Sequence, residues 1–539
     1  QRVAAAPHVE DIVAGFSSVY DFLLAHRDAL AAADGPLAGF RSGVARRVLR
    51  PTTTYVRLLD RSWHPRFAAD LGALEADVRT QLAAPQPGLR PSRAERAIER
   101  RALIGGDVPY FSVRVAAGGG RACRRRLAGF SADDKARQVW VARMALTSFE
   151  TPLAKPPIRP APAADADAIE AAARGIGERL SGLAIRRGGR ASWLYPFLDG
   201  GVRLTPVGAG FDLYDGLAGI ALVLGGLAAR LGEPRFARLA EATLAEALDL
   251  WRGMKRETIA IGAYDGAAGL AWTLAVLARQ SGRRDWLRQA GRIVRVHAGS
   301  AAADPLRDLI SGRAGFLAAG LAVAEITSDE GLVRALRPCA LSLALDELPA
   351  EGDAGLAHGR AGIGFALAQF ARHDADAGAF ERAVALIEDD LAIAVAARAG
   401  EGAPEGEADG RTMLAWCRGG VGAALALLRL GRPAVAETEA LVQAVAADGG
   451  AALCPCHGAL GVLEFLEAAK GAGFAGAASA LDRLRAEILA RVIGGELCAD
   501  PCHRIEAPGL MMGLAGTGWS LLRVLDPARF PSVLTLGAA

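Results

Sequence analysis

The chain has 539 residues, 52% hydrophobic and only 6% aromatic, so it is long enough for two or three domains with cores of Ala, Leu, Val and Gly. Its seven cysteines lack the spacing of a disulfide framework, which favours a reducing cytoplasm and metal or thiol chemistry. Glu10 and Asp11 argue against a signal peptide, and the longest uncharged apolar run, residues 507–522, is too short to span a membrane. We therefore expect a soluble, cytoplasmic protein.

Charge is distributed unevenly along the chain. Residues 1–150 carry 23 Lys and Arg against 15 Asp and Glu, whereas the remainder is acidic overall. The basic part favours an anionic ligand such as a phosphate, a nucleotide or an acidic peptide. A solvated surface with an excess of arginine explains the same charge equally well.

The first segments predict helices and a basic corner. Apolar residues recur at helical spacing over residues 9–30, which predicts an amphipathic helix. Arg46 and Arg50 are four residues apart and would share a helix face, with Pro51 ending that helix. Two guanidinium groups beside the threonines 52–54 favour a phosphate-binding corner. A solvated basic helix face remains an alternative.

Residues 94–104 and 132–147 predict two further helices, separated by a short extended run at 111–115. The glycine-flanked arginines between 121 and 126 predict a basic loop. No independent core is obvious, so residues 1–150 read as the C-terminal part of a larger, mainly helical domain. Five prolines between residues 152 and 162 predict an extended linker over residues 151–166.

A repeat dominates the rest of the chain. Seven Gly-x-x-Gly pairs, 39 to 60 residues apart, each open an apolar run of helical length; their first residues are Gly216, Gly266, Gly312, Gly359, Gly419, Gly458 and Gly513. More polar helical segments lie between them, which predicts a two-helix repeat. Because the inner helices are apolar on nearly all sides, they must be buried. Residues 167–539 therefore predict an all-α fold, an α/α toroid of seven inner and seven outer helices.

Chemistry-bearing residues precede the glycine pairs. If the inner helices are parallel, these residues share one end of the toroid; they are Tyr214, Asp215, Tyr264, Asp265, Asp308, His358, Cys417, Cys456 and His457. Cys417 and Cys456 each stand two residues before a pair, and His457 follows Cys456. Two thiols and an imidazole are typical of a three-ligand zinc site that keeps a fourth position for substrate. Two buried structural cysteines beside a chance histidine are the alternative.

These motifs together resemble a known family. The strings WCRGG at 416–420, CHG at 456–458 and AHGRAG at 357–362 are similar to the lanthionine synthetase C-like cyclase. Upstream, RRVLRPTTTY at 46–55 and GDVPYF at 106–111 resemble the C-terminal part of the dehydratase domain in class II (LanM-type) lanthipeptide synthetases. The resemblance implies a zinc-dependent cyclase, part of a bifunctional dehydratase and cyclase. Such an enzyme forms lanthionine and methyllanthionine thioether rings by adding Cys thiols to dehydrated Ser and Thr of a precursor peptide.

The resemblance also implies roles for individual residues. Cys417, Cys456 and His457 match the zinc ligands, His358 the catalytic histidine and Asp308 the active-site aspartate, while Arg46 and Thr52 match residues that eliminate phosphate. Arg418 departs from the family, which usually has His or Tyr at that position. These residues show no nucleotide-binding portion of the dehydratase, so we expect either a fragment of a longer enzyme or a naturally truncated one, with ATP and Mg²⁺ needed only by that portion. We expect that this chain alone does not dehydrate Ser or Thr.

The implied partner is a precursor peptide with a leader and a core rich in Cys, Ser and Thr. A transporter or membrane-associated biosynthetic complex is a further candidate, and no nucleic-acid partner or transmembrane segment is expected. Two other functions stay open: a non-catalytic, zinc-stabilised peptide-binding scaffold, and another α/α-barrel enzyme such as a glycosidase, which would use carboxylates such as Asp215, Asp265 and Asp308. His358 and Asp308 could also serve only as helix caps. Cys498, Cys502 and His503 form a second candidate metal cluster, for which we favour a loop of reduced thiols.

Overall fold

The protein forms two compact units. In the computed structural model, unit 1 comprises residues 1–13 and 137–539, and unit 2 comprises residues 14–136. The structure describes residues 6–38, 43–83, 91–114, 117–146, 165–199, 203–346, 354–398, 414–447, 452–496 and 506–537. The prolines of the predicted linker and the cluster Cys498, Cys502 and His503 lie outside these residues. No helix among them has the length and apolar character that crossing a membrane requires.

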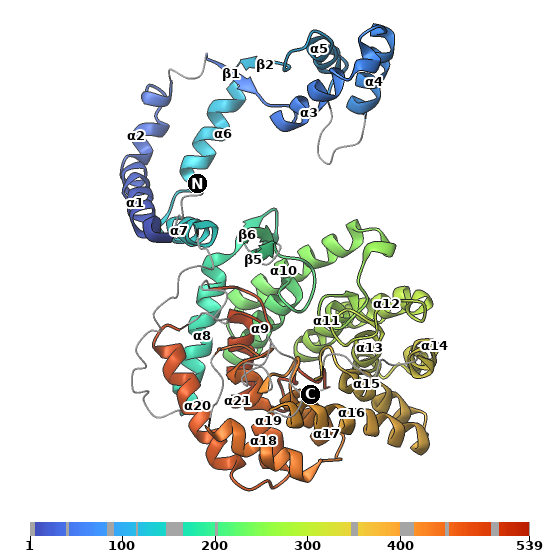
Figure 1. The fold of residues 1–539 in the computed structure, drawn as a ribbon. Coiled ribbons are helices and arrows are strands. Elements are labelled where there is room, and N and C mark those ends of the chain that lie inside the picture. The colour runs from blue at the N-terminus through green and yellow to red at the C-terminus, as the bar shows by residue number, and fades with distance from the viewer. Residues whose placement is uncertain are drawn as a thin grey trace. The chain divides into compact units, whose positions relative to one another are not determined.

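The N-terminal segments are mainly helical, with one small sheet (Figure 1). The elements in chain order are α1 (Val9–Ala25), α2 (Arg27–Ala31), β1 (Val44–Arg47), α3 (Thr52–Ser62), α4 (Leu71–Ala83), α5 (Arg93–Ile104), β2 (Phe111–Arg114), α6 (Ala117–Ala128) and α7 (Ala132–Leu146). Strands β1 and β2 pair antiparallel, with Val44 opposite Arg114. A small core of α3, α4 and α5 buries Tyr55, Leu59, Val78 and Leu103, so this unit does have a core of its own.

Two of the sequence-based predictions for this unit are wrong. Arg46 lies on strand β1, and Pro51 caps the start of α3 instead of ending a helix. Proline lacks an N–H and fixes φ near the helical value, so it is tolerated at a helix start as well as after a helix end. The arginines 124–126 lie in α6 and not in a loop, because arginine is a good helix former and the last helical turn favours cations.

A buried ion pair holds α5 to the segment before α3. The side chains of Arg50 and Glu99 are 2% and 0% exposed, and Arg50 Nε lies 2.6 Å from Glu99 Oε1. Tyr55 Oη donates to the same carboxylate at 2.7 Å, and Arg50 also donates to the Leu82 carbonyl at 3.0 Å. Arg50 is therefore a structural residue, in contrast to the exposed Arg46.

Glu99→Ala is expected to destabilise unit 2 by about 3–5 kcal/mol, because it leaves the Arg50 guanidinium buried without a counter-charge. The loss is measured as a shift of the urea-induced unfolding transition. Glu75→Ala is the matched control, since Glu75 and Arg100 form an ion pair with both side chains nearly half exposed. That variant should change stability by less than about 0.5 kcal/mol. Equal stability of the two variants would contradict the role of Glu99.

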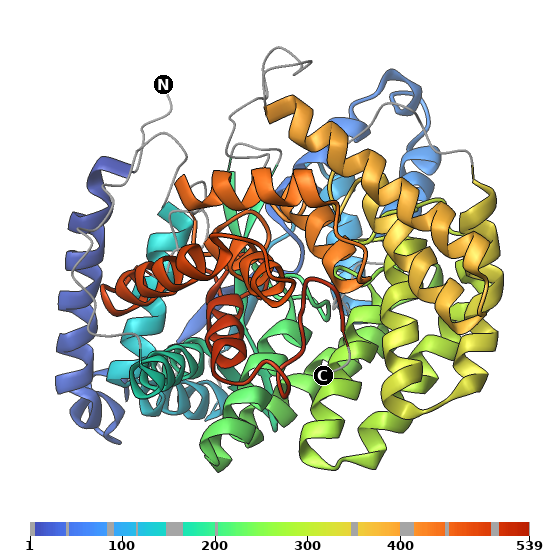
Figure 2. The ribbon, with the colours of Figure 1, turned by 90° about the horizontal axis from the view of Figure 1, so that it is seen from below.

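Unit 1 is the predicted α/α toroid. Its inner helices are α9 (Leu217–Leu231), α11 (Ala267–Ser281), α13 (Arg313–Thr327), α15 (Arg360–His373), α17 (Gly420–Arg429), α19 (Ala459–Gly471) and α21 (Leu514–Leu525). The outer helices are α8 (Ala166–Leu183), α10 (Pro234–Gly253), α12 (Arg284–Ala301), α14 (Glu330–Leu345), α16 (Ala377–Arg398), α18 (Val435–Ala447) and α20 (Ala477–Ile493). Each inner helix contacts the next, and α21 contacts α9, so the ring is closed (Figure 2).

Within unit 1, the described residues between α8 and α9 form two antiparallel hairpins. The first joins β3 (Ile185–Arg187) to β4 (Arg190–Ser192), and the second joins β5 (Leu194–Asp199) to β6 (Arg203–Gly208). Neither hairpin interrupts the ring of helices, so the all-α architecture predicted for this part of the chain is confirmed.

The glycine pairs account for the close packing of the loops that lead into the inner helices. The first glycine of each pair is the N-cap of an inner helix, as at Gly312 before α13. The second glycine faces backbone: a Cβ at Gly315 would lie 2.0 Å from the Leu309 carbonyl oxygen and 2.5 Å from the Ala263 nitrogen. A side chain there would separate adjacent loops, so the pattern reflects backbone packing.

The seven loops that lead into the inner helices, here called the rim, are joined by backbone hydrogen bonds. Each loop donates to a carbonyl of the next: Tyr214 to Tyr264, Tyr264 to Ile310, Leu309 to Ala357, Ala357 to Cys417, Cys417 to Cys456, Cys456 to Met511, and Met511 back to Tyr214. The chain of bonds therefore closes on itself. All seven loops lie at one end of the toroid, as the parallel arrangement of the inner helices predicts.

The C-terminal segment fills the interior of the toroid below the rim. Phe530, Val533, Leu534 and Leu536 are fully buried. The carbonyl oxygen of Leu534 accepts from Trp416 Nε1 at 3.2 Å and from the Tyr264 hydroxyl at 3.1 Å. The segment is thereby tied to two rim loops from below.

Candidate metal centre on the rim

Cys417, Cys456 and His457 come together on two neighbouring rim loops. Cys417 precedes α17, whereas Cys456 and His457 precede α19, the next inner helix. Their ligand atoms all lie within 4.8 Å of one another. The backbone bond from Cys417 N to Cys456 O, 3.2 Å long, holds the loops in this register.

The donor set and its spacing fit a zinc ion. Zinc binds sulfur at about 2.3 Å and imidazole nitrogen at about 2.0–2.1 Å, so the donor atoms of a tetrahedral site lie roughly 3.5–4 Å apart. Cys456 is buried, whereas Cys417 and His457 are half-buried, so the cluster can be approached from the rim. Within the described ranges, no other trio of His, Cys, Asp and Glu is close enough to hold a metal.

The thiols of Cys417 and Cys456 differ in pKa. Hydrogen bonding from Cys456, together with His457, lowers the pKa of the Cys417 thiol. The same contact raises the pKa of Cys456, as does its burial. The Tyr214 hydroxyl donates to Cys456 Sγ at 3.0 Å, and burial raises the pKa of Tyr214 well above its usual value. The pattern thus favours a thiolate at Cys417 beside a thiol at Cys456.

His358 and Asp308 form a second pair on the rim. His358 Nδ1 lies 3.3 Å from Asp308 Oδ2, and the two side chains are 34% and 25% exposed. Asp308 Oδ1 accepts hydrogen bonds from Ser311 N and Gly312 N, at 3.0 and 2.9 Å. The carboxylate therefore caps the start of α13 with one oxygen and orients His358 with the other. The positive charge of a protonated His358 contributes, after Cys456 and His457, to lowering the pKa of Cys417.

The other acidic residues of the rim have structural partners. Asp265 accepts from the Ser311 hydroxyl at 2.6 Å, and burial raises the pKa of Asp265. Asp212 was not predicted; burial raises its pKa, and it accepts from Asp215 N at 3.1 Å. The sequence repeat could have indicated Asp212 as a rim residue, because Asp212 precedes Gly216 by four residues, as Asp308 precedes Gly312.

The two residues predicted for phosphate elimination lie on different elements of unit 2. Arg46 is exposed on β1, with its guanidinium 5.7 Å from the centre of the Tyr110 ring. Thr52 is exposed at the first residue of α3.

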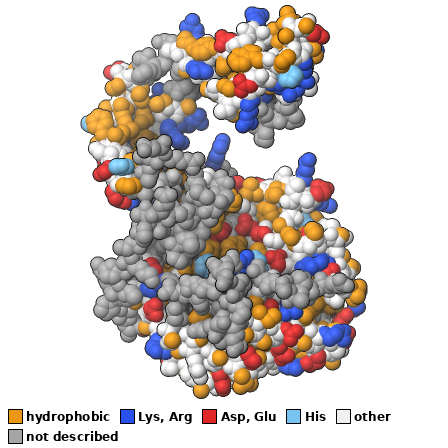
Figure 3. All heavy atoms as spheres, viewed as in Figure 1, with side chains coloured by type: hydrophobic (Ala, Val, Ile, Leu, Met, Phe, Trp, Pro, Cys, Tyr) orange, Lys and Arg blue, Asp and Glu red, His pale blue; other side chains and the backbone are white. Residues whose placement is uncertain are grey.

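Figure 3 shows the surface of unit 1, where histidine and acidic side chains lie among hydrophobic ones near the middle of the face in view.

Comparisons with known proteins identify both parts of the chain. Residues 209–535 match the family model of the lanthionine synthetase C-like protein, and residues 1–114 match a domain of unknown function (DUF4135) that occurs in LanM-type proteins. A solved structure, nisin cyclase, matches with a TM-score of 0.46 and 17% identity, over 68% of this chain and 96% of that chain. No curated protein sequence matches. The chain belongs to the lanthionine synthetase C-like family, and its two matched segments make it a LanM-type lanthipeptide synthetase with a lanthionine cyclase domain.

Proposed function

We propose that the rim closes thioether rings in a precursor peptide and that Cys417, Cys456 and His457 hold a zinc ion for this reaction. The observation that supports the proposal is that two thiol sulfurs and one imidazole nitrogen lie within 4.8 Å of one another, on the rim of a lanthionine synthetase C-like toroid. When bound there, zinc would lower the pKa of a substrate cysteine thiol, so that a thiolate is available near neutral pH.

The neighbouring residues have separate roles in this reaction. Tyr214 donates to Cys456 Sγ and orients this ligand. The substrate thiolate adds to the β-carbon of a dehydroalanine or dehydrobutyrine, forming the carbon–sulfur bond and moving the double-bond electrons toward the carbonyl oxygen. His358 then supplies the proton that the α-carbon takes up. Asp308 holds Nδ1 of His358, which leaves Nε2 as the nitrogen that faces the peptide.

The test uses a predehydrated linear peptide that carries cysteine. Zinc-loaded protein should convert the free thiol of the peptide into a thioether, which leaves the peptide mass unchanged, at a rate well above that of the uncatalysed addition. After a chelator has removed the zinc, the cyclisation rate should fall to the uncatalysed rate, and it should recover when zinc is added back. Alkylation of remaining thiols, followed by mass spectrometry, gives the time course. A peptide-binding scaffold would bind the peptide without changing this rate, and a glycosidase would leave the peptide untouched.

A second proposal concerns bifunctionality. We propose that residues 1–150 are the C-terminal part of a dehydratase domain, joined through a linker at residues 151–166 to a cyclase domain at residues 167–539. The match of residues 1–114 to a domain that occurs in LanM-type proteins supports this division. Arg46 and Thr52 would then take part in eliminating phosphate from phosphorylated Ser or Thr, with Arg46 stabilising the departing anion.

Arg46→Ala is expected to slow phosphate release from a phosphorylated precursor peptide by about 10²–10³-fold, the usual loss when one donor to a developing anion is removed. Released phosphate and the mass of the dehydrated peptide are measured together. Arg57→Ala is the control, because Arg57 is an exposed arginine on α3. Equal effects of the two substitutions, or no release by the unmodified chain, would contradict the elimination role.

A further inference from the structure

A cavity lined in part by charged side chains lies at the end of the toroid opposite the rim. Its volume is about 550 Å³, within the range of small-molecule sites. The last turns of α15, α17, α19 and α21 line it, together with α20 and the C-terminal segment. Because the inner helices begin at the rim, their last turns lie at the far end, and the cavity is separate from the candidate metal centre.

Most of the charged side chains in the lining are cationic. Five of them face the cavity, Arg372, Arg429, Lys470, Arg485 and Arg523, against the single carboxylate of Glu467. Cations are favoured in the last turn of a helix, which accounts for four of the five. It does not account for Arg485, which comes from the middle of the outer helix α20.

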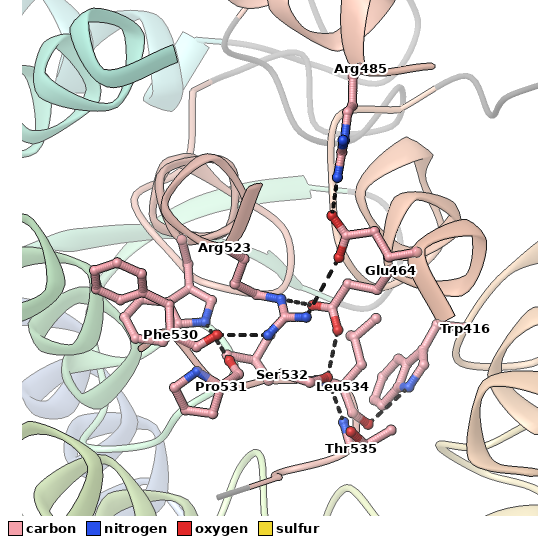
Figure 4. A network of polar contacts seen from close by, with 12 residues as sticks. Trp416, Glu464, Arg485, Arg523, Phe530, Pro531, Ser532, Leu534 and Thr535 are labelled. Atoms are coloured by element: carbon pink, nitrogen blue, oxygen red, sulfur yellow. Dashed lines mark hydrogen bonds and ion pairs between the residues drawn. The ribbon is translucent and has the colours of Figure 1, made fainter. Parts of the chain in front are cut away.

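Existing ion pairs neutralise only part of this charge. Arg485 pairs with Glu467 at 2.9 Å, and Arg523 lies 3.2 Å from the buried Glu464 while donating to the Phe530 carbonyl at 2.7 Å (Figure 4). Arg429 and Lys470 form no ion pair with residues that the structure describes. Both are exposed at the mouth of the cavity, so their charge is available to a ligand.

Buried donors in the lining also lack acceptors. Gln369 Nε2 and Arg485 Nε are shielded from solvent and have no hydrogen-bond acceptor among the described residues. Arg523 Nε is close to Glu464 but is not in hydrogen-bonding geometry. The Arg523 side chain is 4% exposed. Leaving a buried donor unpaired is costly, so the two unpaired nitrogens of Gln369 and Arg485 favour a ligand that brings acceptors.

We propose that this cavity binds a small anion that carries phosphate or carboxylate groups. The guanidinium groups of Arg485 and Arg523 and the amide of Gln369 would donate to its oxygens, while Arg429 and Lys470 would balance its charge at the mouth. Charge-assisted hydrogen bonds to planar guanidinium groups suit both kinds of oxyanion. The proposal is independent of the cyclase reaction, because none of these residues lies on the rim.

Calorimetric titration of the whole chain with inorganic phosphate, and separately with succinate, tests the proposal and distinguishes the two kinds of anion. Both probes are chosen because they bind zinc more weakly than pyrophosphate or citrate would, and ionic strength is held constant with sodium chloride. Arg429→Gln and Lys470→Gln should each weaken binding of the preferred anion by about two- to fivefold, the loss of one exposed charge at the mouth of the cavity. Zinc content and the cyclisation rate should not change in either variant.

Arg238→Gln is the matched control, an exposed arginine of the outer helix α10 with no role in the cavity. It should bind the anion as the unmodified chain does. Hydrogen exchange with saturating anion should show added protection in residues 523–537, which line or adjoin the cavity. Unchanged affinity in Arg429→Gln and Lys470→Gln, equal weakening in Arg238→Gln, or no binding of either anion would each overturn the proposal.

Discussion

Cys456→Ala is expected to lose bound zinc and to cyclise a predehydrated peptide only at the uncatalysed rate. Cys456 is the most buried of the three candidate ligands and stands between Cys417 and the Tyr214 hydroxyl. Even removal of an outer-shell partner typically lowers metal affinity about 10–100-fold, so loss of a direct ligand should cost more. Elemental analysis of the purified protein should find about one zinc per unmodified chain and none in the variant.

Cys454→Ala is the matched control for this experiment. Cys454 is a fully buried thiol two residues away, but it is outside the group whose ligand atoms lie within 4.8 Å. Its replacement should leave zinc content and cyclisation unchanged and cost only the small packing energy of one sulfur atom. If Cys456→Ala keeps its full zinc content, the assignment of these ligands is wrong. If Cys454→Ala loses the metal as well, Cys454 must be counted among the metal ligands.

His358→Asn should slow cyclisation by about 10²–10⁴-fold while leaving zinc content and thermal unfolding nearly unchanged. The reason is that His358 lies on the exposed rim and belongs to no ligand group, so its loss removes proton transfer and not the metal. The rate is followed by thiol alkylation and mass spectrometry, with the uncatalysed addition subtracted. Cyclisation of the variant at the unmodified rate would mean that His358 only caps a helix.

Asp308→Asn separates orientation of the histidine from capping of the helix. An asparagine side chain can still accept hydrogen bonds from Ser311 N and Gly312 N, so the start of α13 should stay intact. It loses the negative charge that faces His358 Nδ1. We expect a rate between those of the unmodified chain and His358→Asn, at unchanged thermal stability. Lowered stability with an unchanged rate would assign Asp308 to capping alone.

The toroid could be predicted because one physical constraint repeats seven times. Each inner helix begins where a glycine permits close approach of a neighbouring loop, and each is apolar on nearly all sides. Spacing and polarity therefore indicate both the number of units and the end at which their loops meet. The placement of Cys417, Cys456 and His457 on one rim follows from the same periodicity, since α17 and α19 are adjacent in the ring.

Features that depend on long-range contacts could not be predicted. Strand β1 exists because it pairs with β2, more than 60 residues later, and nothing local distinguishes a proline that starts a helix from one that follows it. The contact from Tyr214 to Cys456 joins the first unit of the repeat to the sixth. The buried position of residues 530–536 could not be predicted either, because a short apolar segment after a helix can end inside or outside a barrel.

Because the rim hydrogen bonds form a closed circle, this repeat protein should unfold differently from an open solenoid. In an open solenoid, terminal repeats have one neighbour each and fray first, so stability is close to a sum over units. Here the bond from Met511 to Tyr214 joins the last unit to the first, and no unit is terminal. Opening any one loop costs contacts on two sides, which favours a single cooperative transition for the toroid. Because the circle of bonds closes only when the last unit is in place, we expect the register of the rim loops, those of Cys417 and Cys456 included, to be completed late in folding.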